Sequence, residues 1–261
     1  MEVQFDKYQG AGNDFVILDN RSEKYSSLTT SQIAFLCDRF KGIGADGLIL
    51  INADTAADFQ MQYFNSDGNE STLCGNGGRC AVAFAHLKNI ITESTVFSAI
   101  DGMHSATYIN PLEVHLEMRD VAEFKQQSGA VILNTGSPHY IKFVEDVDAL
   151  NVNKEGAAIR YSESFMPEGI NVNFVEQKDA THYKIRTYER GVEGETLACG
   201  TGAVAAALGI HYTRQSISEK EFHLAAVGGD LKVSFEVNEG IYRNIFLKGP
   251  ATYVFSGTIE L

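Results

Sequence analysis

One loop sequence occurs twice in this chain of 261 residues. Residues 70–83 read ESTLCGNGGRCAVA, and residues 195–208 read ETLACGTGAVAAAL. In both copies a glutamate stands four residues before a cysteine, a Cys-Gly-X-Gly turn follows, and an alanine-rich run comes next. Cys74 and Cys199 are 125 residues apart, which is nearly half of the chain. The repeat predicts a duplicated fold whose halves each place one cysteine where a tight loop becomes a helix.

Other residues recur at nearly the same offset, as a duplication requires. The recurring features are Gly44 with Gly169, Tyr63 with Tyr188, Gly10 with Gly136 after one residue of slip, and, near each half's end, the strands LEVHLEM (112–118) and LKVSFEV (231–237). Any one of these matches can arise by chance. Their shared order and offset predict two similar halves.

The hydrophobic pattern predicts many short strands and few helices. Strands are expected at 3–8, 14–19, 47–52, 58–64, 112–118, 183–189 and 231–237, and helices at 30–40, 76–88 and 201–213. In the first helix Ile33, Leu36, Cys37 and Phe40 fall on one apolar stripe. Few helices among many strands indicate an α+β fold rather than a regular βαβ alternation. The polar stretch 119–130 is the best candidate for the boundary between the halves.

Composition excludes several classes of function. The net charge is −13 with a pI of about 4.9, and no Lys/Arg run is present, so nucleic acid is not an expected partner. No apolar stretch approaches the roughly 20 residues that span a bilayer, and the N-terminal sequence is unlike a signal peptide. The four cysteines show neither C-x-x-C nor zinc-finger spacing, so we expect no metal and a reducing cytoplasm.

A cysteine at a helix start has a definite chemistry. The thiolate is the reactive form of cysteine, and the partial positive charge at a helix N-terminus favours it. The N–H groups of the same helix turn can hold a carboxylate, which glycines allow to approach closely. Two such loops facing one carbon would let one thiolate remove a proton while the other thiol delivers one to the opposite face. The sequence therefore predicts inversion of a stereocentre without a cofactor.

The chain resembles the diaminopimelate epimerase family over nearly its whole length. The motifs that carry the resemblance are GAGNDF (10–15), GIGADG (42–47), NSDGNE (65–70), CGNGGRC (74–80), GSPH (136–139), GINVNF (169–174), YERG (188–191) and ACGTG (198–202). The resemblance implies an α+β fold with two pseudo-symmetric domains, each a β-barrel around a central helix, and an active site in the interdomain cleft. It implies residues 1–124 plus 250–261 as the N-terminal half and 125–249 as the C-terminal half.

The same resemblance implies an activity and its partners. The activity is the cofactor-independent interconversion of LL- and meso-2,6-diaminopimelate, a step of lysine and peptidoglycan biosynthesis. The expected partners are the small-molecule substrate and a second copy of the chain in a homodimer.

Site residues follow from the resemblance position by position. Cys74 and Cys199 match the family's two proton carriers. The loop that holds the reacting α-carboxylate matches Gly75, Asn76, Gly200 and Thr201, and the other substrate-binding positions match Asn13, Asn65, Asn171, Glu189 and Arg190. His139 and Glu189 match residues that tune the ionisation of the thiols. Because the substrate's distal end is an ammonium and a carboxylate, amides, an arginine and an acid all find partners there.

Two positions depart from the family. Some members carry asparagine where GSPH has Ser137, and some carry glutamine where GIGADG ends in Gly47. A serine can still donate to substrate, through a water if needed, so contact at Ser137 stays open. Gly47 has no side chain to offer, so no contact is expected there.

Ordinary structural roles compete with the functional ones. Cys37 and Cys80 are expected in the core, and Asn13, Asn65 and Asn171 can each serve turns. Glu70 and Glu195 are expected to brace their loops by accepting hydrogen bonds from backbone N–H groups.

Three other functions compete with the epimerase. They are a proline or hydroxyproline racemase with the same two thiols, an isomerase of the phenazine-biosynthesis type that does not use them, and a non-catalytic amino-acid binding protein.

Overall fold

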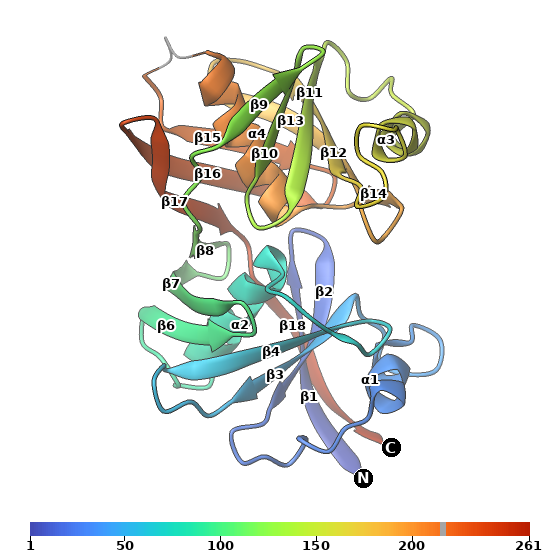
Figure 1. The fold of residues 1–261 in the computed structure, drawn as a ribbon. Coiled ribbons are helices and arrows are strands. Elements are labelled where there is room, and N and C mark those ends of the chain that lie inside the picture. The colour runs from blue at the N-terminus through green and yellow to red at the C-terminus, as the bar shows by residue number, and fades with distance from the viewer. Residues whose placement is uncertain (215–217) are drawn as a thin grey trace. The chain divides into compact units, whose positions relative to one another are not determined.

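The computed structural model describes residues 1–214 and 218–261, and it divides into two compact units (Figure 1). The first unit comprises Met1–Leu116 and Gly249–Leu261, and the second comprises Glu117–Lys248. In each unit a mostly antiparallel sheet curls around one central helix. The predicted α+β fold with two similar, barrel-like halves is confirmed.

The first unit contains the central helix α2 (Gly75–Leu87), the short helix α1 (Thr30–Cys37) and the N-terminal strands. Its strands are β1 (Glu2–Gly10), β2 (Asn13–Asp19), β3 (Gly47–Asn52), β4 (Phe59–Asn65), β5 (Glu70–Ser71), β6 (Ser94–Ala99), β7 (Gly102–Asn110), β8 (Glu113–Met118) and β18 (Thr252–Glu260). They pair in the order β18-β1-β2-β3-β4-β6-β7-β8, and β5 adds to β4. The pairs β2–β3 and β4–β6 are parallel, and the others are antiparallel.

The second unit repeats this plan. It contains the central helix α4 (Gly200–Thr213), the short helix α3 (Val152–Arg160) and the strands β9 (Phe124–Gln127), β10 (Ala130–Asn134), β11 (Pro138–Val144), β12 (Asn171–Gln177), β13 (His182–Glu189), β14 (Gly194–Thr196), β15 (Glu221–Ala226), β16 (Gly229–Asn238) and β17 (Ile241–Gly249). Their order is β9-β10-β11-β12-β13-β15-β16-β17, and β14 adds to β13. Here β11–β12 and β13–β15 are the parallel pairs, so strand order and direction match the first unit pair for pair.

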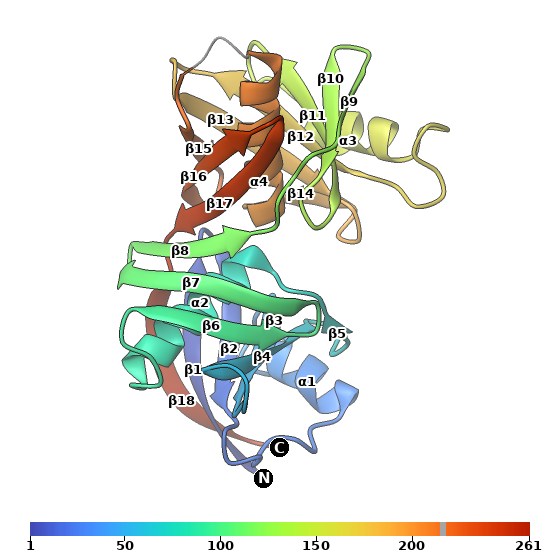
Figure 2. The ribbon, with the colours of Figure 1, turned by 60° about the vertical axis from the view of Figure 1, so that its left-hand side comes forward.

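Both central helices are buried on every side, because small residues make them narrow enough to lie inside a curled sheet. All residues of α2 from Gly75 to Ala85 are buried, and so are those of α4 from Gly202 to His211. Helix α2 contacts β1, β2, β7 and β18, and Figure 2 shows it beneath the strands of its own unit. A helix that is covered on every face belongs to a core. The alanine-rich run after each repeated cysteine therefore becomes the axis of its unit.

The predicted helix at 30–40 is wrong in its last turn. Helix α1 begins with a capping box between Thr29 and Gln32 and ends at Cys37. The Asp38 carboxylate then accepts the N–H groups of Phe40 at 2.8 Å and Lys41 at 2.9 Å, which turns the chain away. Phe40 is 98% exposed and does not share the buried stripe.

Helix α3 has no counterpart among the predicted helices. Its sequence VNKEGAAIR buries only Val152 and Gly156, so it carries no clear apolar stripe. Asn151 caps it by accepting the Lys154 N–H at 3.0 Å. Gly156 allows the helix to lie against β13, since a Cβ there would stand 2.4 Å from Cβ of Tyr188.

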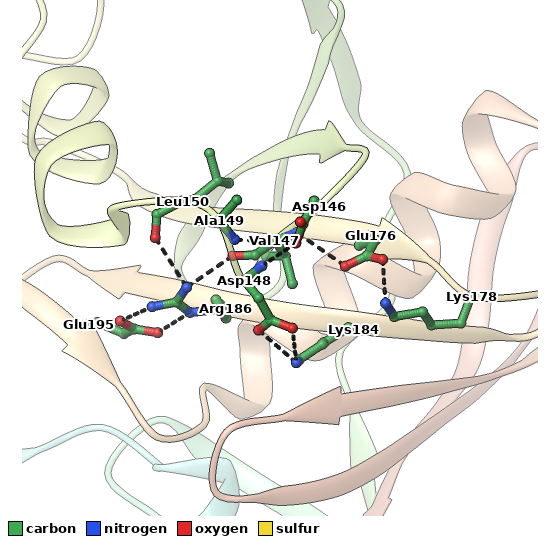
Figure 3. Close-up of polar contacts among 10 residues, drawn as sticks. All are labelled: Asp146, Val147, Asp148, Ala149, Leu150, Glu176, Lys178, Lys184, Arg186 and Glu195. Atoms are coloured by element: carbon green, nitrogen blue, oxygen red, sulfur yellow. Dashed lines mark hydrogen bonds and ion pairs between the residues drawn. The ribbon is translucent and has the colours of Figure 1, made fainter.

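The loop before α3 is held over β12 and β13 by charged side chains (Figure 3). Arg186 donates through Nη1 to the carbonyls of Val147 at 2.9 Å and Leu150 at 3.2 Å, and its other nitrogens bind Glu195 at 2.6 and 2.7 Å. Glu176 accepts the Val147 N–H at 3.1 Å. Glu195 thus pairs with an arginine side chain, and the prediction that its carboxylate braces backbone N–H groups is wrong.

Candidate active site

Cys74 is the N-cap residue of α2. Its backbone is extended (φ −84°, ψ 120°), and its carbonyl accepts the Gly78 N–H at 2.7 Å. Its side chain makes no capping hydrogen bond, unlike the Ser, Thr, Asp or Asn side chains usual at this position. The partly exposed thiol therefore lies at the positive end of the helix dipole without being used as a cap.

Cys199 occupies the same place on α4. Its backbone is again extended (φ −117°, ψ 110°), its carbonyl accepts the Ala203 N–H at 2.9 Å, and its side chain makes no capping bond. The thiol is partly exposed. The other two cysteines, Cys37 and Cys80, are buried. Burial raises the pKa of each of these two thiols to about 12, which confirms their predicted place in the core.

In the first unit, Asn76 joins the helix start to the GAGNDF loop. Its Nδ2 donates to Oδ1 of Asn13 at 2.6 Å, and Asn13 Nδ2 donates in turn to Asp46 Oδ2 at 2.8 Å. Thr201 takes the equivalent place in the second unit, where its Oγ1 lies 3.0 Å from Nε2 of His139 in the GSPH loop. In both units the second residue after the cysteine thus bonds to the fourth residue of the equivalent glycine-led motif, which is GAGNDF in the first unit and GSPH in the second.

Arg79 is a buried cation that the sequence reading left out. Its side chain is fully buried in α2, where Nη2 donates to Asn76 Oδ1 at 2.8 Å and Nε to the Pro250 carbonyl at 3.3 Å. Nη1 has no hydrogen-bond partner among the described residues. Burial lowers the pKa of Arg79 to about 10, so the side chain keeps its charge at neutral pH. The sequence signal for this residue was an arginine about one turn into an alanine-rich helix. An unpaired charge is rarely buried, so such an arginine indicates specific partners inside the protein.

The remaining candidates of the first unit lie where neighbouring strands of the sheet begin or end. Gly47 begins β3 opposite Asn65, the last residue of β4. Asn65 closes the turn 65–69, since its N–H donates to the Asn69 carbonyl at 3.0 Å and its carbonyl accepts from Gly68 at 2.9 Å. A Cβ at Gly47 would stand 2.5 Å from the Phe64 carbonyl oxygen, so this backbone has no room for a larger residue. The structure thus brings Asn13, Asp46, Gly47 and Asn65 to one edge.

His139 is fully buried and held from both sides of its ring. Nε2 lies 3.0 Å from Thr201 Oγ1, and Nδ1 lies 3.0 Å from Nδ2 of Asn173. Thr201 Oγ1 is in turn 3.5 Å from Sγ of Cys199. Burial, reinforced by the charge of Arg190, lowers the pKa of His139 to about 3. At neutral pH His139 is therefore an uncharged group that reaches the thiol through a hydroxyl.

Asn171, Glu189 and Arg190 meet where β12 begins and β13 ends. Asn171 is paired with His139 in the parallel register of β11 and β12. Its Nδ2 donates to Ser137 Oγ at 2.7 Å and to the Pro138 carbonyl at 3.0 Å, and its Oδ1 accepts the Arg190 N–H at 2.9 Å. Both hydrogens of the amide are used inside the protein, so what Asn171 offers a ligand is an acceptor.

The side chains of the other two residues have partners nearby. Thr196 of β14 donates to Glu189 Oε1, and Arg190 Nη1 donates to the Glu168 carbonyl at 3.2 Å. His139 contacts Thr201 in the first turn of α4, and Asn171, its neighbour in the sheet, accepts the backbone N–H of Arg190, so these four residues lie close together. No cluster of metal-ligating side chains occurs among residues 1–214 and 218–261, and no helix there is long and apolar enough to cross a membrane.

The chain matches known proteins over nearly its whole length. A sequence model described as "Diaminopimelate epimerase" matches residues 5–110 and 131–254. A diaminopimelate epimerase of Flavobacterium psychrophilum is 51% identical over 97% of this chain and 98% of its own length. A diaminopimelate epimerase of Chlorobaculum tepidum is 44% identical over 97% of this chain and 99% of its own length.

Solved structures of low sequence identity share the fold. A phenazine biosynthesis protein of the PhzF family from Bacillus anthracis superimposes with a TM-score of 0.77 at 17% identity, covering 100% of both chains. A hydroxyproline epimerase from Agrobacterium vitis gives 0.71 at 14% identity, covering 100% of this chain and 93% of its own. The match of the family model and the full-length identity to curated epimerases show that the chain belongs to the diaminopimelate epimerase family.

Proposed function

We propose that the chain interconverts LL- and meso-2,6-diaminopimelate with Cys74 and Cys199 as its two proton carriers and no cofactor. The observation that carries the proposal is the repeated thiol. Two units of the same topology each begin their central helix at a partly exposed cysteine whose side chain is not used as a cap. A reaction that needs one base and one acid on opposite faces of a carbon would use both cysteines.

The proposed reaction moves two protons and conserves charge. One cysteine as thiolate removes the α-proton, and the electron pair spreads into the α-carboxylate. The other cysteine as thiol then delivers its proton to the opposite face, and the roles are reversed in the reverse direction. General acid–base catalysis supplies about 10²–10⁴-fold, so stabilisation of the developing charge has to supply much of the rest. One preorganised donor is worth about 3–4 kcal/mol.

The α-carboxylate is assigned to the helix starts. The N–H groups of Gly75 and Asn76 on α2, and of Gly200 and Thr201 on α4, belong to the first turns of their helices, where backbone donors have no partner within the helix. Asn13, Asn65, Asn171, Glu189 and Arg190 are assigned to the rest of the substrate. The acceptor that Asn171 offers suits the distal ammonium, and Arg190 suits the distal carboxylate.

His139 and Glu189 are assigned to the tuning of the thiols. Because His139 is neutral, its influence on Cys199 is by orientation of Thr201 rather than by charge. The two epimerase halves are residues 1–124 plus 250–261 and residues 125–249. The protein acts as a homodimer in the cytoplasm. Size-exclusion chromatography with light scattering tests the dimer.

Substrate and cysteine variants test the function together. Purified protein without added cofactor should epimerise LL-diaminopimelate and leave proline and hydroxyproline unchanged, since a cyclic imino acid lacks partners for Arg190 and the asparagines. Cys74→Ala and Cys199→Ala should each lose activity by about 10²-fold or more. Cys37→Ala, a buried thiol outside the site, is the matched control and should keep it.

Each rival function has its own outcome. Turnover of proline in place of diaminopimelate would indicate the racemase. Full activity in Cys74→Ala would indicate an isomerase that does not use the thiols. Binding of diaminopimelate without exchange of its α-hydrogen would indicate a binding protein.

A further inference from the structure

Asn173 is a fully buried amide in strand β12, between the apolar residues Val172 and Phe174. A buried amide is costly unless its polar atoms are hydrogen-bonded. Here Oδ1 accepts the hydroxyl of Thr187 at 3.0 Å, and Nδ2 lies 3.0 Å from His139 Nδ1 and 3.5 Å from the Tyr140 carbonyl oxygen. Every polar atom of this side chain is therefore used within the unit.

These neighbours fix which way the amide points. The Tyr140 carbonyl can only accept, so the side of Asn173 that faces it and His139 has to be the NH₂ group. The Thr187 hydroxyl meets the oxygen on the other side. His139 Nδ1 consequently accepts a hydrogen bond and carries no hydrogen itself.

The hydrogen of His139 is thereby assigned to Nε2. The ring is neutral at physiological pH and so has one N–H. Nε2–H donates to Thr201 Oγ1 at 3.0 Å, which leaves the hydroxyl hydrogen of Thr201 to turn toward another acceptor. Sγ of Cys199 lies 3.5 Å from that oxygen. A hydroxyl that donates to sulfur favours the ionised form of the sulfur.

We propose that Asn173 is a positioning residue for Cys199: by holding His139 in its Nε2–H tautomer, it keeps the Thr201 hydroxyl donating to the Cys199 sulfur. The assignment rests on the proposed function of Cys199 as a proton carrier. A second observation supports it. A Cβ at Gly202 would stand 2.4 Å from Asn173 Oδ1, so the glycine of ACGTG makes room for this amide beside the helix start.

Asn173→Asp tests the tautomer directly. At a pH of about 8 a carboxylate at 173 can only accept, so the neutral ring of His139 should carry its hydrogen on Nδ1 and leave Nε2 as the acceptor. The ¹⁵N chemical shifts of the imidazole distinguish the two forms, and the signals of His139 are assigned by their loss in His139→Gln. In the second form the Thr201 hydroxyl donates to His139 and no longer to sulfur.

Kinetics test the consequence for Cys199. Loss of a hydrogen bond to a charged group should lower kcat by about 10- to 100-fold in Asn173→Asp, with KM little changed because no substrate contact is removed. Thr201→Val should show the same split, and Thr201→Ser, which keeps the hydroxyl, should restore most of kcat. The double variant Asn173→Asp/Thr201→Val should be no slower than Thr201→Val alone, since both changes remove one interaction.

Three outcomes would refute the role of Asn173, and a second variant tests this role if Asn173→Asp does not fold. Wild-type ¹⁵N shifts or wild-type kcat in folded Asn173→Asp would refute it, as would additive losses in the double variant. If Asn173→Asp does not fold, Thr187→Val frees the amide oxygen and should lower kcat, whereas Thr187→Ser should not. If the wild-type protein does not epimerise diaminopimelate, the proposed function fails, yet the ¹⁵N measurement still decides whether Asn173 sets the tautomer.

Discussion

Thr201 and Asn76 hold equivalent places in the two units, but they present different chemistry to the cysteine before them. Asn76 is an amide held by Asn13 and by the buried cation Arg79, whereas Thr201 is a hydroxyl held by the neutral ring of His139. The duplicated backbone is thus combined with side chains that have diverged. We expect the two thiols to differ in reactivity, although each serves as base in one direction.

The buried ring of His139 makes stability depend on pH. The pKa of His139 in the folded protein, about 3, lies below its ordinary value of 6.5. Between pH 6.5 and 3 this residue is therefore protonated in the unfolded chain but neutral in the folded protein. The free energy of unfolding should therefore fall as the pH drops from 6.5 toward 3, by up to about 1.4 kcal/mol per pH unit from this residue.

Urea unfolding at several pH values checks this prediction. His139→Gln should show a shallower decline over the same range, because it lacks the group that resists protonation. Equal slopes in the two proteins would show that His139 does not stay neutral when buried.

Helix α4 offers a matched pair of glycines. The atoms nearest to a Cβ at Gly209 would belong to Ile141 and Val131 at 3.6–3.7 Å, which is ordinary contact, so Gly209→Ala should be neutral or raise stability by about 0.5–1 kcal/mol. At Gly202 the added carbon would stand 2.4 Å from Asn173 Oδ1 and 3.3 Å from Cys199 Sγ. Gly202→Ala should lower stability by about 1–3 kcal/mol and also lower kcat. Thermal unfolding and initial rates measure both; equal behaviour of the two variants would contradict the packing described for Asn173.

The loop 146–150 offers a second matched pair (Figure 3). Arg186 holds two carbonyls of this loop and the carboxylate of Glu195, with a largely buried side chain, so Arg186→Met should lower the free energy of unfolding by about 2–3 kcal/mol. Lys184 binds Asp148, whose side chain is 61% exposed, and such a pair is worth about 0–1 kcal/mol. Urea unfolding of Arg186→Met and Lys184→Met compares them. A loss at Lys184 as large as at Arg186 would show that the loop is not anchored by the arginine.

Sequence patterns located the elements that are repeated or strongly apolar, and they failed where tertiary contacts decide. The starts of α2 and α4 followed from the Cys-Gly loops and alanine runs. Helix α3 was not predicted, because its position depends on the fit of Gly156 against Tyr188, which no local sequence pattern encodes. The last turn of α1 was misplaced because the Asp38 carboxylate, rather than propensity, ends the helix.

At the site the same limit applies. The predicted residues came from the repeat and from resemblance, and both single out residues near the thiols. Arg79 and Asn173 lie inside the core, where their hydrogen-bond partners come from distant segments such as Pro250 and Thr187. No local sequence pattern encodes these long-range contacts.

At the scale of the molecule, we propose that each of the two like units supplies one thiol to the same α-carbon of the substrate. The most direct test incubates LL-diaminopimelate in D₂O without cofactor and follows the first meso product by mass spectrometry and NMR. Because the delivering thiol exchanges its hydrogen with solvent, the first product should carry deuterium at the inverted carbon while the remaining LL substrate still carries protium. A first product that keeps its original proton, or activity that survives alkylation of both Cys74 and Cys199, would contradict the two-thiol mechanism.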